Sequence, residues 1–189
     1  MAAMNTSILR RVFWFLNKIF MVPMFRLGFG PFMGNPLSGY IMVIKTAGRK
    51  SGKTRYSPVN YCIYYGDLYC IAGWGKLSDW YRNILANPNI EVIHPDGPLA
   101  GVAEVVTDRV NRNTMLRMVL KNAGFAGFLE GFNPFKVTDE ELERKLGDLP
   151  LIRIHPTGLG NGANDPAGWN WVWTLVFSAV LIYLLVYVF

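Results

Sequence analysis

Short apolar runs separated by turn signals fill the middle of the chain. Six of them have the length and β-branched content typical of strands, and they cover residues 40–46, 56–65, 68–73, 90–94, 99–106 and 149–154. Helical patterns are fewer, and they cover residues 79–86, about 107–122 and a turn that begins at Thr138. Many short strands with few helices predict a small antiparallel β-barrel, α+β overall.

The N-terminal region has a different pattern. Over residues 7–29, polar side chains recur at helical spacing as a narrow stripe, while aromatic and aliphatic residues cover the remaining circumference. Such a helix is predicted to lie in the plane of a membrane surface, because Lys18 would sit mid-bilayer in a spanning helix. The alternative is an amphipathic helix packed on its own domain. We therefore assign residues 1–39 to a membrane-surface helix and a following loop.

The C-terminal end carries the longest apolar run. Residues 169–189 contain no charged side chain, and tryptophans lead the run. About twenty apolar residues span a bilayer, and aromatic residues favour its interfaces. The pattern predicts a single-pass C-terminal transmembrane helix that holds the barrel domain, residues 40–158, on the cytoplasmic side. Residues 159–168 are rich in glycine and asparagine and are predicted to be a flexible linker.

Charge divides the chain unevenly. Residues 1–66 carry nine Lys or Arg and no Asp or Glu, whereas the remainder carries ten basic against thirteen acidic residues. Most of the basic residues in the first part fall in one helix and one turn. This arrangement favours anionic lipid or an anionic ligand over nucleic acid as the partner.

The basic turn is the strongest chemical signal. Five cations occur within the eleven residues from Lys45 to Arg55, between two predicted strands. Guanidinium groups and a turn rich in backbone N–H groups suit a phosphate or another polyanion. A nucleotide-binding P-loop is excluded, because Pro58 and the strand formers beyond it prevent the helix that such a loop must open. The alternative is a solvated basic hairpin turn.

Two cysteines flank a predicted hairpin with Gly66-Asp67 at its tip. In this register Cys62 faces Ile71 and Ile63 faces Cys70, so the two thiols point to opposite faces of the sheet. No disulfide is expected, which agrees with a reducing compartment. The sequence shows no Ser-His-Asp, Cys-His or metal constellation, so no metal is predicted and the catalytic residue is left unassigned.

Three motifs, in order along the chain, carry a family resemblance. They are Thr46-x-Gly48-Arg49-Lys50-Ser51-Gly52-x-x-Arg55-x-x-Pro58-Val59, then Trp80-Tyr81-x-Asn83-x-x-Ala86-Asn87-Pro88, then Leu149-Pro150-x-x-Arg153-x-x-Pro156-Thr157-Gly158. Over roughly residues 40–158 the chain resembles the deazaflavin (F-420)-dependent nitroreductase and quinone reductase family. These are split-β-barrel oxidoreductases related to the flavin reductases and pyridoxamine-phosphate oxidases.

The resemblance implies a deazaflavin cofactor and roles for particular residues. Arg49, Lys50, Ser51 and Arg55 would hold the cofactor phosphate, and Tyr56, Ser57, Pro58, Val59 and Asn60 would lie beside the ring system. Ala72, Gly73 and Trp74 would supply backbone contacts, and Trp80 and Asn83 would close over the ribityl and phosphate portion. For Trp80 the alternative is a core aromatic.

Two segments depart from the family pattern. The loop after Ala72 is about three residues shorter and lacks the family's serine and lysine, for which Lys76 is the candidate replacement. The tyrosine-lined substrate segment is replaced by phenylalanines, of which Phe125 and Phe128 are assigned to the substrate pocket. Phe132 and Phe135 complete this set.

The resulting prediction is a membrane-anchored reductase that transfers hydride from reduced deazaflavin to a quinone-like or nitro acceptor. FMN is the alternative cofactor. The alternative function is a non-catalytic or flavin-binding accessory subunit of a membrane electron-transfer complex. Expected partners are membrane lipid, a quinone-like small molecule, and either a second copy of the chain or the subunits of such a complex.

Overall fold

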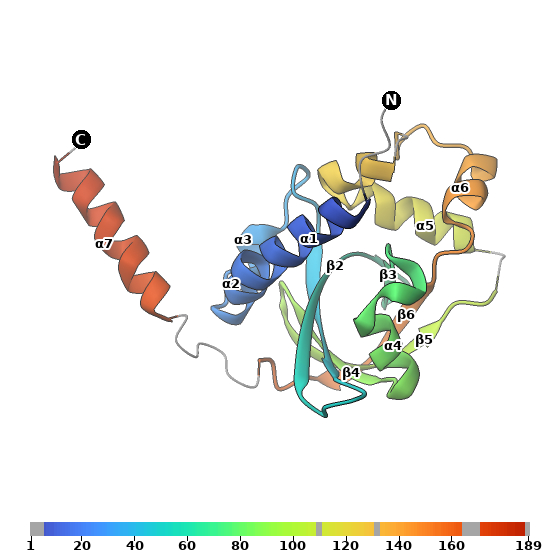
Figure 1. Ribbon diagram of the computed structural model, residues 1–189, viewed down its shortest axis with the longest axis horizontal. Helices are drawn as coiled ribbons and strands as arrows, with labels where there is room; N and C mark the ends of the chain where they lie inside the picture. The colour runs from blue at the N-terminus through green and yellow to red at the C-terminus, as the bar shows by residue number, and fades with distance from the viewer. Residues whose placement is uncertain (1–5, 109–110, 131–132, 164–170, 188–189) are drawn as a thin grey trace.

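Six strands form a closed antiparallel barrel in the computed structural model, which describes residues 6–108, 111–130, 133–163 and 171–187 (Figure 1). The strands are β1 (Ile41–Ala47), β2 (Thr54–Tyr64), β3 (Asp67–Ile71), β4 (Asn89–His94), β5 (Gly97–Val105) and β6 (Leu151–Leu159). Their order around the barrel is β1-β2-β3-β6-β5-β4, closed by the pairing of β1 with β4. The predicted small antiparallel barrel is confirmed.

The last strand is longer than predicted. β6 continues past residue 154 through Pro156, and Leu159 still pairs with Leu99 of β5. Pro156 lies opposite Gly101, next to a register shift in β5, which is a position where a strand tolerates the missing proline N–H. The barrel therefore includes the start of the segment predicted as a flexible linker.

The chain just beyond β6 is fixed on the barrel. Lys45 Nζ donates to the carbonyl oxygen of Gly162 at 2.7 Å and lies 3.0 Å from Glu91 Oε2. The backbone N–H of Asn161 donates to the same Glu91 oxygen at 2.9 Å. These contacts tie residues 161 and 162 to β1 and β4. Flexibility of the linker stays a prediction. Residues 164–168 lie outside the described part of the chain.

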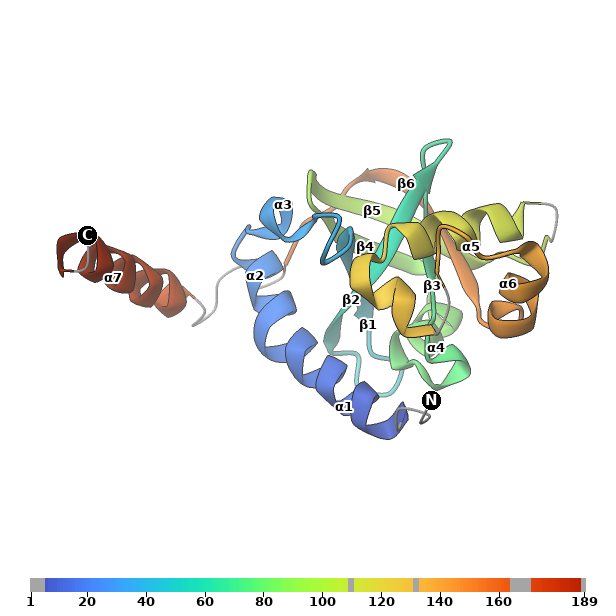
Figure 2. The same ribbon diagram turned by 90° about the horizontal axis from the view of Figure 1, so that it is seen from above.

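Two apolar clusters stabilise the fold, one inside the barrel and one outside it. The inner cluster includes Met42, Ile44, Cys70 and Ile152, all with fully buried side chains. The outer cluster packs helices α5 (Arg112–Lys121) and α6 (Asp139–Leu146) against the sheet (Figure 2), through residues that include Cys62, Leu116, Val119, Leu142 and Leu151. Burying both faces of these strands explains their nearly continuous apolar runs.

The β2–β3 hairpin turns one residue earlier than predicted. Its central residues are Tyr65 and Gly66, both with positive φ (49° and 85°), as a type I′ turn requires. Cys62 therefore pairs with Tyr69, and Tyr61 pairs with Cys70. This register differs from the predicted one by two residues, so the two thiols still face opposite sides of the sheet. Both cysteines are free, and burial raises the pKa of Cys62 to about 12.

The helix predictions near the barrel are largely correct. Helix α4 spans Asp79–Ala86 as predicted, and Thr138 caps α6 by accepting a hydrogen bond from the Glu141 N–H at 3.3 Å. Helix α5 begins at Arg112, several residues later than predicted. Two short 3₁₀ helices, η2 (Gly75–Leu77) and η3 (Gly124–Glu130), complete this part of the fold.

The N-terminal residues form helix α1 (Thr6–Leu16), a π-helical segment η1 (Asn17–Met21), α2 (Val22–Arg26) and α3 (Gly30–Met33), which lie along one side of the barrel. Phe25 is buried, and the Arg26 guanidinium lies 5.6 Å from the centre of the Tyr56 ring on β2. This end of the segment therefore packs on its own domain, as the second interpretation expected. The outer face of α1 remains exposed, with Trp14 61% accessible. A membrane-surface role for that face stays a prediction.

The predicted C-terminal membrane anchor is wrong. Helix α7 spans Trp171–Tyr187, and across the described ranges no helix combines the length and apolar character needed to cross a membrane. The assignment of the barrel to the cytoplasmic side depended on this anchor and falls with it. Residues 169–170 and 188–189 lie outside the described part.

Candidate functional site

The basic turn between β1 and β2 closes on itself through backbone hydrogen bonds. The Gly48 N–H donates to the Lys53 carbonyl at 2.9 Å, and the Ser51 and Gly52 N–H groups both donate to the Gly48 carbonyl, at 3.1 and 2.7 Å. Gly52 has φ +64°, a conformation that glycine adopts without strain. These amides are therefore used inside the turn. Recognition of an anion here depends on side chains more than on the backbone donors that the sequence suggested.

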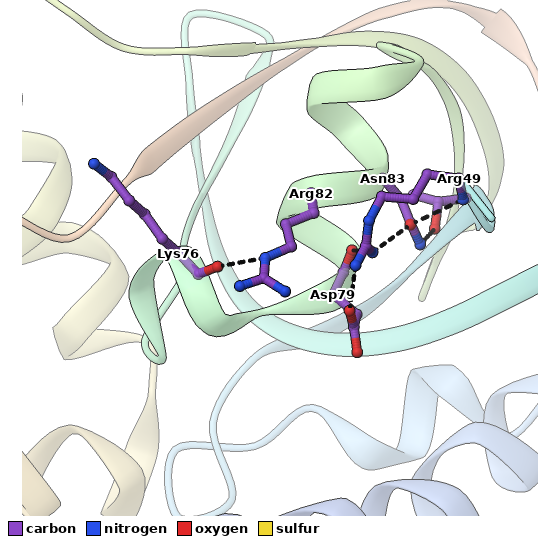
Figure 3. Close-up of polar contacts among 6 residues, drawn as sticks. Arg49, Lys76, Asp79, Arg82 and Asn83 are labelled. Atoms are coloured by element: carbon purple, nitrogen blue, oxygen red, sulfur yellow. Dashed lines mark hydrogen bonds and ion pairs between the residues drawn. The ribbon is translucent and has the colours of Figure 1, made fainter.

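Arg49 is fixed to helix α4 by a network that Figure 3 shows. Its Nη2 lies 3.0 Å from Asp79 Oδ1, and its Nη1 donates to Asn83 Oδ1 at 3.2 Å. The backbone N–H of Arg49 donates to the same Asn83 oxygen, also at 3.2 Å. Both the backbone and the guanidinium of Arg49 are thus held by one helix.

Asn83 connects three elements. Its side chain is 4% exposed, and its Nδ2 donates to Thr46 Oγ1 of β1 at 3.2 Å while its Oδ1 accepts from Arg49. A buried amide that makes all these contacts has its hydrogen-bonding capacity engaged by the protein. Asn83 is therefore placed to position the turn rather than to close over a ligand.

The other cations of the turn are exposed and available. Lys50, Lys53 and Arg55 all lie at the surface, and no carboxylate of the described residues forms an ion pair with them. Ser51 lies between them, and its hydroxyl accepts a hydrogen bond from the Lys53 N–H at 3.4 Å. Three uncompensated cations on a closed turn create a local positive potential that favours binding of an oxyanion.

The outer face of β2 leads away from this turn. Val59 packs against the inner core, so by strand alternation Tyr56, Pro58 and Asn60 lie on the outer face. Arg26 of α2 covers Tyr56 from one side, and Asn60 Nδ2 donates to the Tyr40 carbonyl at 3.3 Å. From Thr54 to Asn60 the strand extends about 20 Å. This half-buried strip joins the basic turn to the region near η3.

Helix η3 brings the phenylalanine pair to the far end of that strip. The Phe125 N–H donates to the Leu37 carbonyl at 2.9 Å, and Asn122 Nδ2 donates to the Tyr61 carbonyl of β2 at 3.0 Å. Phe125 and Phe128 are each about half exposed. In Figure 1 the β1–β2 turn lies at the end of the barrel opposite α5 and η3. The predicted phosphate and substrate residues therefore lie at opposite ends of β2, and Phe132 lies outside the described residues.

The β3–α4 connection has one backbone amide that is engaged by the protein and a neighbouring stretch that is accessible to a ligand. The Ala72 N–H is buried and donates to the Pro150 carbonyl at 2.9 Å, so this amide is not available. Gly73 is exposed, with open space where a side chain would be, and Trp74 is half-buried. Only part of the predicted backbone contact surface is accessible.

Lys76 and Trp80 follow in this segment. The Lys76 carbonyl accepts a hydrogen bond from Arg82 Nε at 2.7 Å, and its amine points away from Arg49 and Asn83 (Figure 3). Lys76 therefore does not join the cations of the turn. Trp80 is half-buried and packs against the inner core cluster, as the alternative interpretation expected.

Two titratable groups inside the barrel, Tyr61 and His94, have shifted pKa values. Burial, with the nearby Asp96 charge, raises the pKa of Tyr61 to about 12, so its phenol stays neutral at physiological pH. His94 is buried with its ring edge-on to Tyr61, and this burial lowers its pKa. Tyr61 faces the inner cluster rather than the outer strip of β2. The catalytic residue remains unassigned.

Two cavities lie away from this strip. One of about 360 Å³ is lined by residues of β5, α5 and β6, including Glu104, Arg112 and Arg153. The other, of about 250 Å³, adjoins Arg112 between η2 and α6. Of the residues that the sequence singled out for the site, only Lys76 lines either of these two cavities, and it lines the second.

Sequence reasoning missed Asp79 as the ion-pair partner of Arg49. It occupies the first position of α4, and a helix N-terminus alone accounts for an acidic residue there. Its separation of four residues from Asn83 was the available signal, because residues i and i+4 share one helix face. The contact with Arg49 could not be read from spacing, since it joins residues thirty positions apart.

Comparison with protein families gives one match. The family described as F420H(2)-dependent quinone reductase matches residues 22–133, more than half of the chain. This segment includes the basic turn, α4 and the segment up to η3. A search of curated proteins found no match.

Several solved structures are similar in part. An F420-H2 dependent reductase is 26% identical, with 60% of this chain and 91% of that chain covered and a TM-score of 0.41. A putative 5-nitroimidazole antibiotic resistance protein from Bacteroides thetaiotaomicron is 11% identical, covering 63% and 74%, with a TM-score of 0.46. A putative pyridoxamine 5'-phosphate oxidase from Listeria innocua is 12% identical, covering 64% and 86%, with a TM-score of 0.43. Family membership of this chain follows from the family match alone.

Proposed function

The chain belongs to the family of deazaflavin-dependent quinone reductases whose pattern matches residues 22–133, and on this premise we propose that it passes hydride to a quinone-like acceptor. Members of the family are oxidoreductases that use the deazaflavin cofactor. The chain is accordingly an enzyme, and the alternatives of a non-catalytic subunit and of FMN as cofactor are set aside. The acceptor and the residue roles are the proposal.

One observation supports the placement of the cofactor. Lys50, Lys53 and Arg55 are exposed on a closed turn, and the described residues offer them no carboxylate partner. A phosphate would supply the missing counter-charge through charge-assisted hydrogen bonds. The donor chemistry of this turn thus fits the phosphate of a deazaflavin cofactor.

With the phosphate at the β1–β2 turn, the rest of the cofactor has to lie on a surface next to that turn. We place the cofactor along the outer face of β2, with Tyr56, Pro58 and Asn60 beneath it and Gly73 leaving room at its edge. When bound, the deazaflavin supplies the hydride chemistry. The chain contributes binding, orientation and exclusion of water. Arg26 over Tyr56 and the neighbouring α2 help to cover this strip.

Phe125 and Phe128 support an apolar acceptor. Both rings are about half exposed at the end of β2 opposite the cationic turn, and neither carries a hydrogen-bonding group. Aromatic faces without a hydroxyl favour a flat, weakly polar ring over a strongly polar nitro compound. We therefore assign the quinone, rather than the nitro compound, as the preferred acceptor.

Steady-state oxidation of the reduced deazaflavin, followed by its absorbance, tests this function. We expect kcat/KM for a short-chain benzoquinone to exceed that for a nitroaromatic compound of similar size by at least about tenfold. Phe125→Ala combined with Phe128→Ala should raise KM for the quinone several-fold, because apolar contact area is lost. Phe32→Ala, which alters an exposed ring on α3, is the matched control and should have no effect. A preference for the nitro compound, or no turnover with either acceptor, would contradict the proposal.

The other expected partners stay predictions. A structure described as a domain-swapped dimer shares 22% identity with the chain at a TM-score of 0.41, too little to bear on its oligomeric state. Sedimentation of the purified full chain would decide between a monomer and a homodimer.

A further inference from the structure

Arg49 differs from the other cations of its turn because it already has an anionic partner. Its Nη2 lies 3.0 Å from Asp79 Oδ1, and its Nη1 also approaches the Asp79 carbonyl at 3.5 Å. Figure 3 shows this carboxylate directed at the guanidinium from the first turn of α4. Within the described ranges, Lys50, Lys53 and Arg55 have no such partner. The protein therefore supplies a counter-charge at one of the four positions where a phosphate would bind.

The Arg49–Asp79 ion pair is accessible and can be exchanged. The Asp79 side chain is 74% exposed and that of Arg49 is 25% exposed. Exposed ion pairs contribute little to stability, so exchanging one for another anion costs little. The hydrogen bonds that the Arg49 backbone N–H and Nη1 donate to Asn83 Oδ1 would keep the arginine in place during the exchange.

Carboxylate and phosphate use the same donors of a guanidinium. Both accept charge-assisted hydrogen bonds from its planar fork, commonly two at a time. Asp79 Oδ1 accepts from one of the two N–H groups of Nη2, so a phosphate oxygen that binds the same N–H group must displace this carboxylate.

We infer that Asp79 is an internal competitor for the cofactor phosphate at Arg49, and that binding of the cofactor breaks the Arg49–Asp79 ion pair. The inference rests on the proposed function and adds a residue that tunes cofactor affinity. Asp79 acts through Arg49, so it is a positioning residue rather than a phosphate ligand. Its carboxylate holds the arginine in the absence of cofactor and lowers the affinity for cofactor.

A double-mutant cycle on the full chain tests this inference. The dissociation constant of the oxidised deazaflavin cofactor is measured by titration calorimetry for wild type, Asp79→Asn, Arg49→Gln and the double variant. Asp79→Asn keeps the shape and a hydrogen-bonding oxygen while removing the charge. We expect it to tighten binding by about three- to tenfold, from the loss of competition at Arg49. In the Arg49→Gln background the same change should alter the affinity by less than about twofold.

Asp139→Asn is the matched control. Asp139 also occupies the first position of a helix, is 66% exposed and pairs with an arginine, Arg117, at 2.6 Å. It lies on α6, outside the proposed cofactor strip. Its substitution should leave the affinity unchanged, which separates competition at Arg49 from the loss of one negative charge anywhere on the protein.

Each outcome is decisive. Unchanged or weaker binding by Asp79→Asn overturns the inference and leaves the proposed function in place. Equal tightening in both Arg49 backgrounds also overturns it, because Asp79 would then act by charge repulsion alone. If wild type and every variant fail to bind the cofactor, both the inference and the proposed function fall.

Discussion

Replacing Arg55 by alanine should weaken binding of the deazaflavin cofactor by about 1.5–3 kcal/mol, the range for hydrogen bonds to charged groups. This corresponds to about one to two orders of magnitude in Kd. Arg55 is exposed at the start of β2, opposite Thr46 in the β1–β2 register, and it forms no ion pair with the described carboxylates. Its guanidinium is therefore free to bind a phosphate, and no internal partner compensates for its loss. Titration calorimetry measures the change.

Arg144→Ala is the control for this substitution. Arg144 is exposed on α6 and has only a weak contact with Glu141 at 3.9 Å. Its removal changes the net charge by the same amount as the loss of Arg55. Equal affinities of the wild type and Arg55→Ala would remove Arg55 from the site. Equal weakening by both variants would reduce its role to general electrostatic attraction.

Replacing Asn83 by leucine should be the most destabilising change in the site. It removes the partner of the Arg49 N–H, the Arg49 guanidinium and the Thr46 hydroxyl, and it leaves the buried hydroxyl unsatisfied. We expect the free energy of unfolding to fall by about 2–4 kcal/mol. The melting temperature should fall by about 5–15 °C, as measured by thermal denaturation. Cofactor affinity should fall as well, because the turn loses its attachment to α4.

Asn83→Asp separates positioning from packing. Aspartate keeps an oxygen that accepts from Arg49, loses the amide donor to Thr46 and adds a negative charge beside Arg49. It should therefore retain more stability than the leucine variant, whereas its added carboxylate should compete with the cofactor phosphate and keep cofactor affinity below that of the wild type. If both variants matched the wild type in stability and affinity, Asn83 would not hold the turn.

The barrel could be predicted because its strands follow local rules. Apolar runs bounded by turn residues located all six strands. The prediction that Cys62 and Cys70 lie on opposite faces was also correct, although the turn was placed one residue too late. That error arose because Tyr65, rather than Gly66, takes the first position of a type I′ turn. A bulky residue with positive φ is uncommon, so the turn residues alone favoured the later position.

Features that depend on distant contacts could not be predicted. β6 continues through Pro156 because β5 is irregular opposite it, and sequence alone does not reveal that pairing. The linker after β6 is held by Lys45 and Glu91, which precede their partners in it by 117 and 70 positions. The apolar C-terminal run was interpreted as a membrane span from its composition, but no helix of the described residues has the length and apolar character to cross a membrane.

The candidate site could be predicted only in part, because several of its contacts also join residues that are far apart in the sequence. Charge density located the basic turn, but it could not show that the turn's backbone donors are used internally. It also could not show that Arg49 is held by Asp79 and Asn83. The sequence treated four residues as equivalent phosphate ligands. Their contacts differ: Arg49 is already paired with Asp79, Ser51 accepts a hydrogen bond inside the turn, and Lys50 and Arg55 form no ion pair with the described carboxylates.

The central claim is that the cations of the β1–β2 turn bind the cofactor phosphate. The most direct test is calorimetric titration of the oxidised deazaflavin cofactor and of its phosphate-free form into wild type and into a Lys50→Ala, Lys53→Ala, Arg55→Ala triple variant. We predict that wild type binds the phosphorylated form at least about a hundredfold more tightly, and that this preference disappears in the triple variant. The same preference in both proteins would place the phosphate elsewhere and contradict the account.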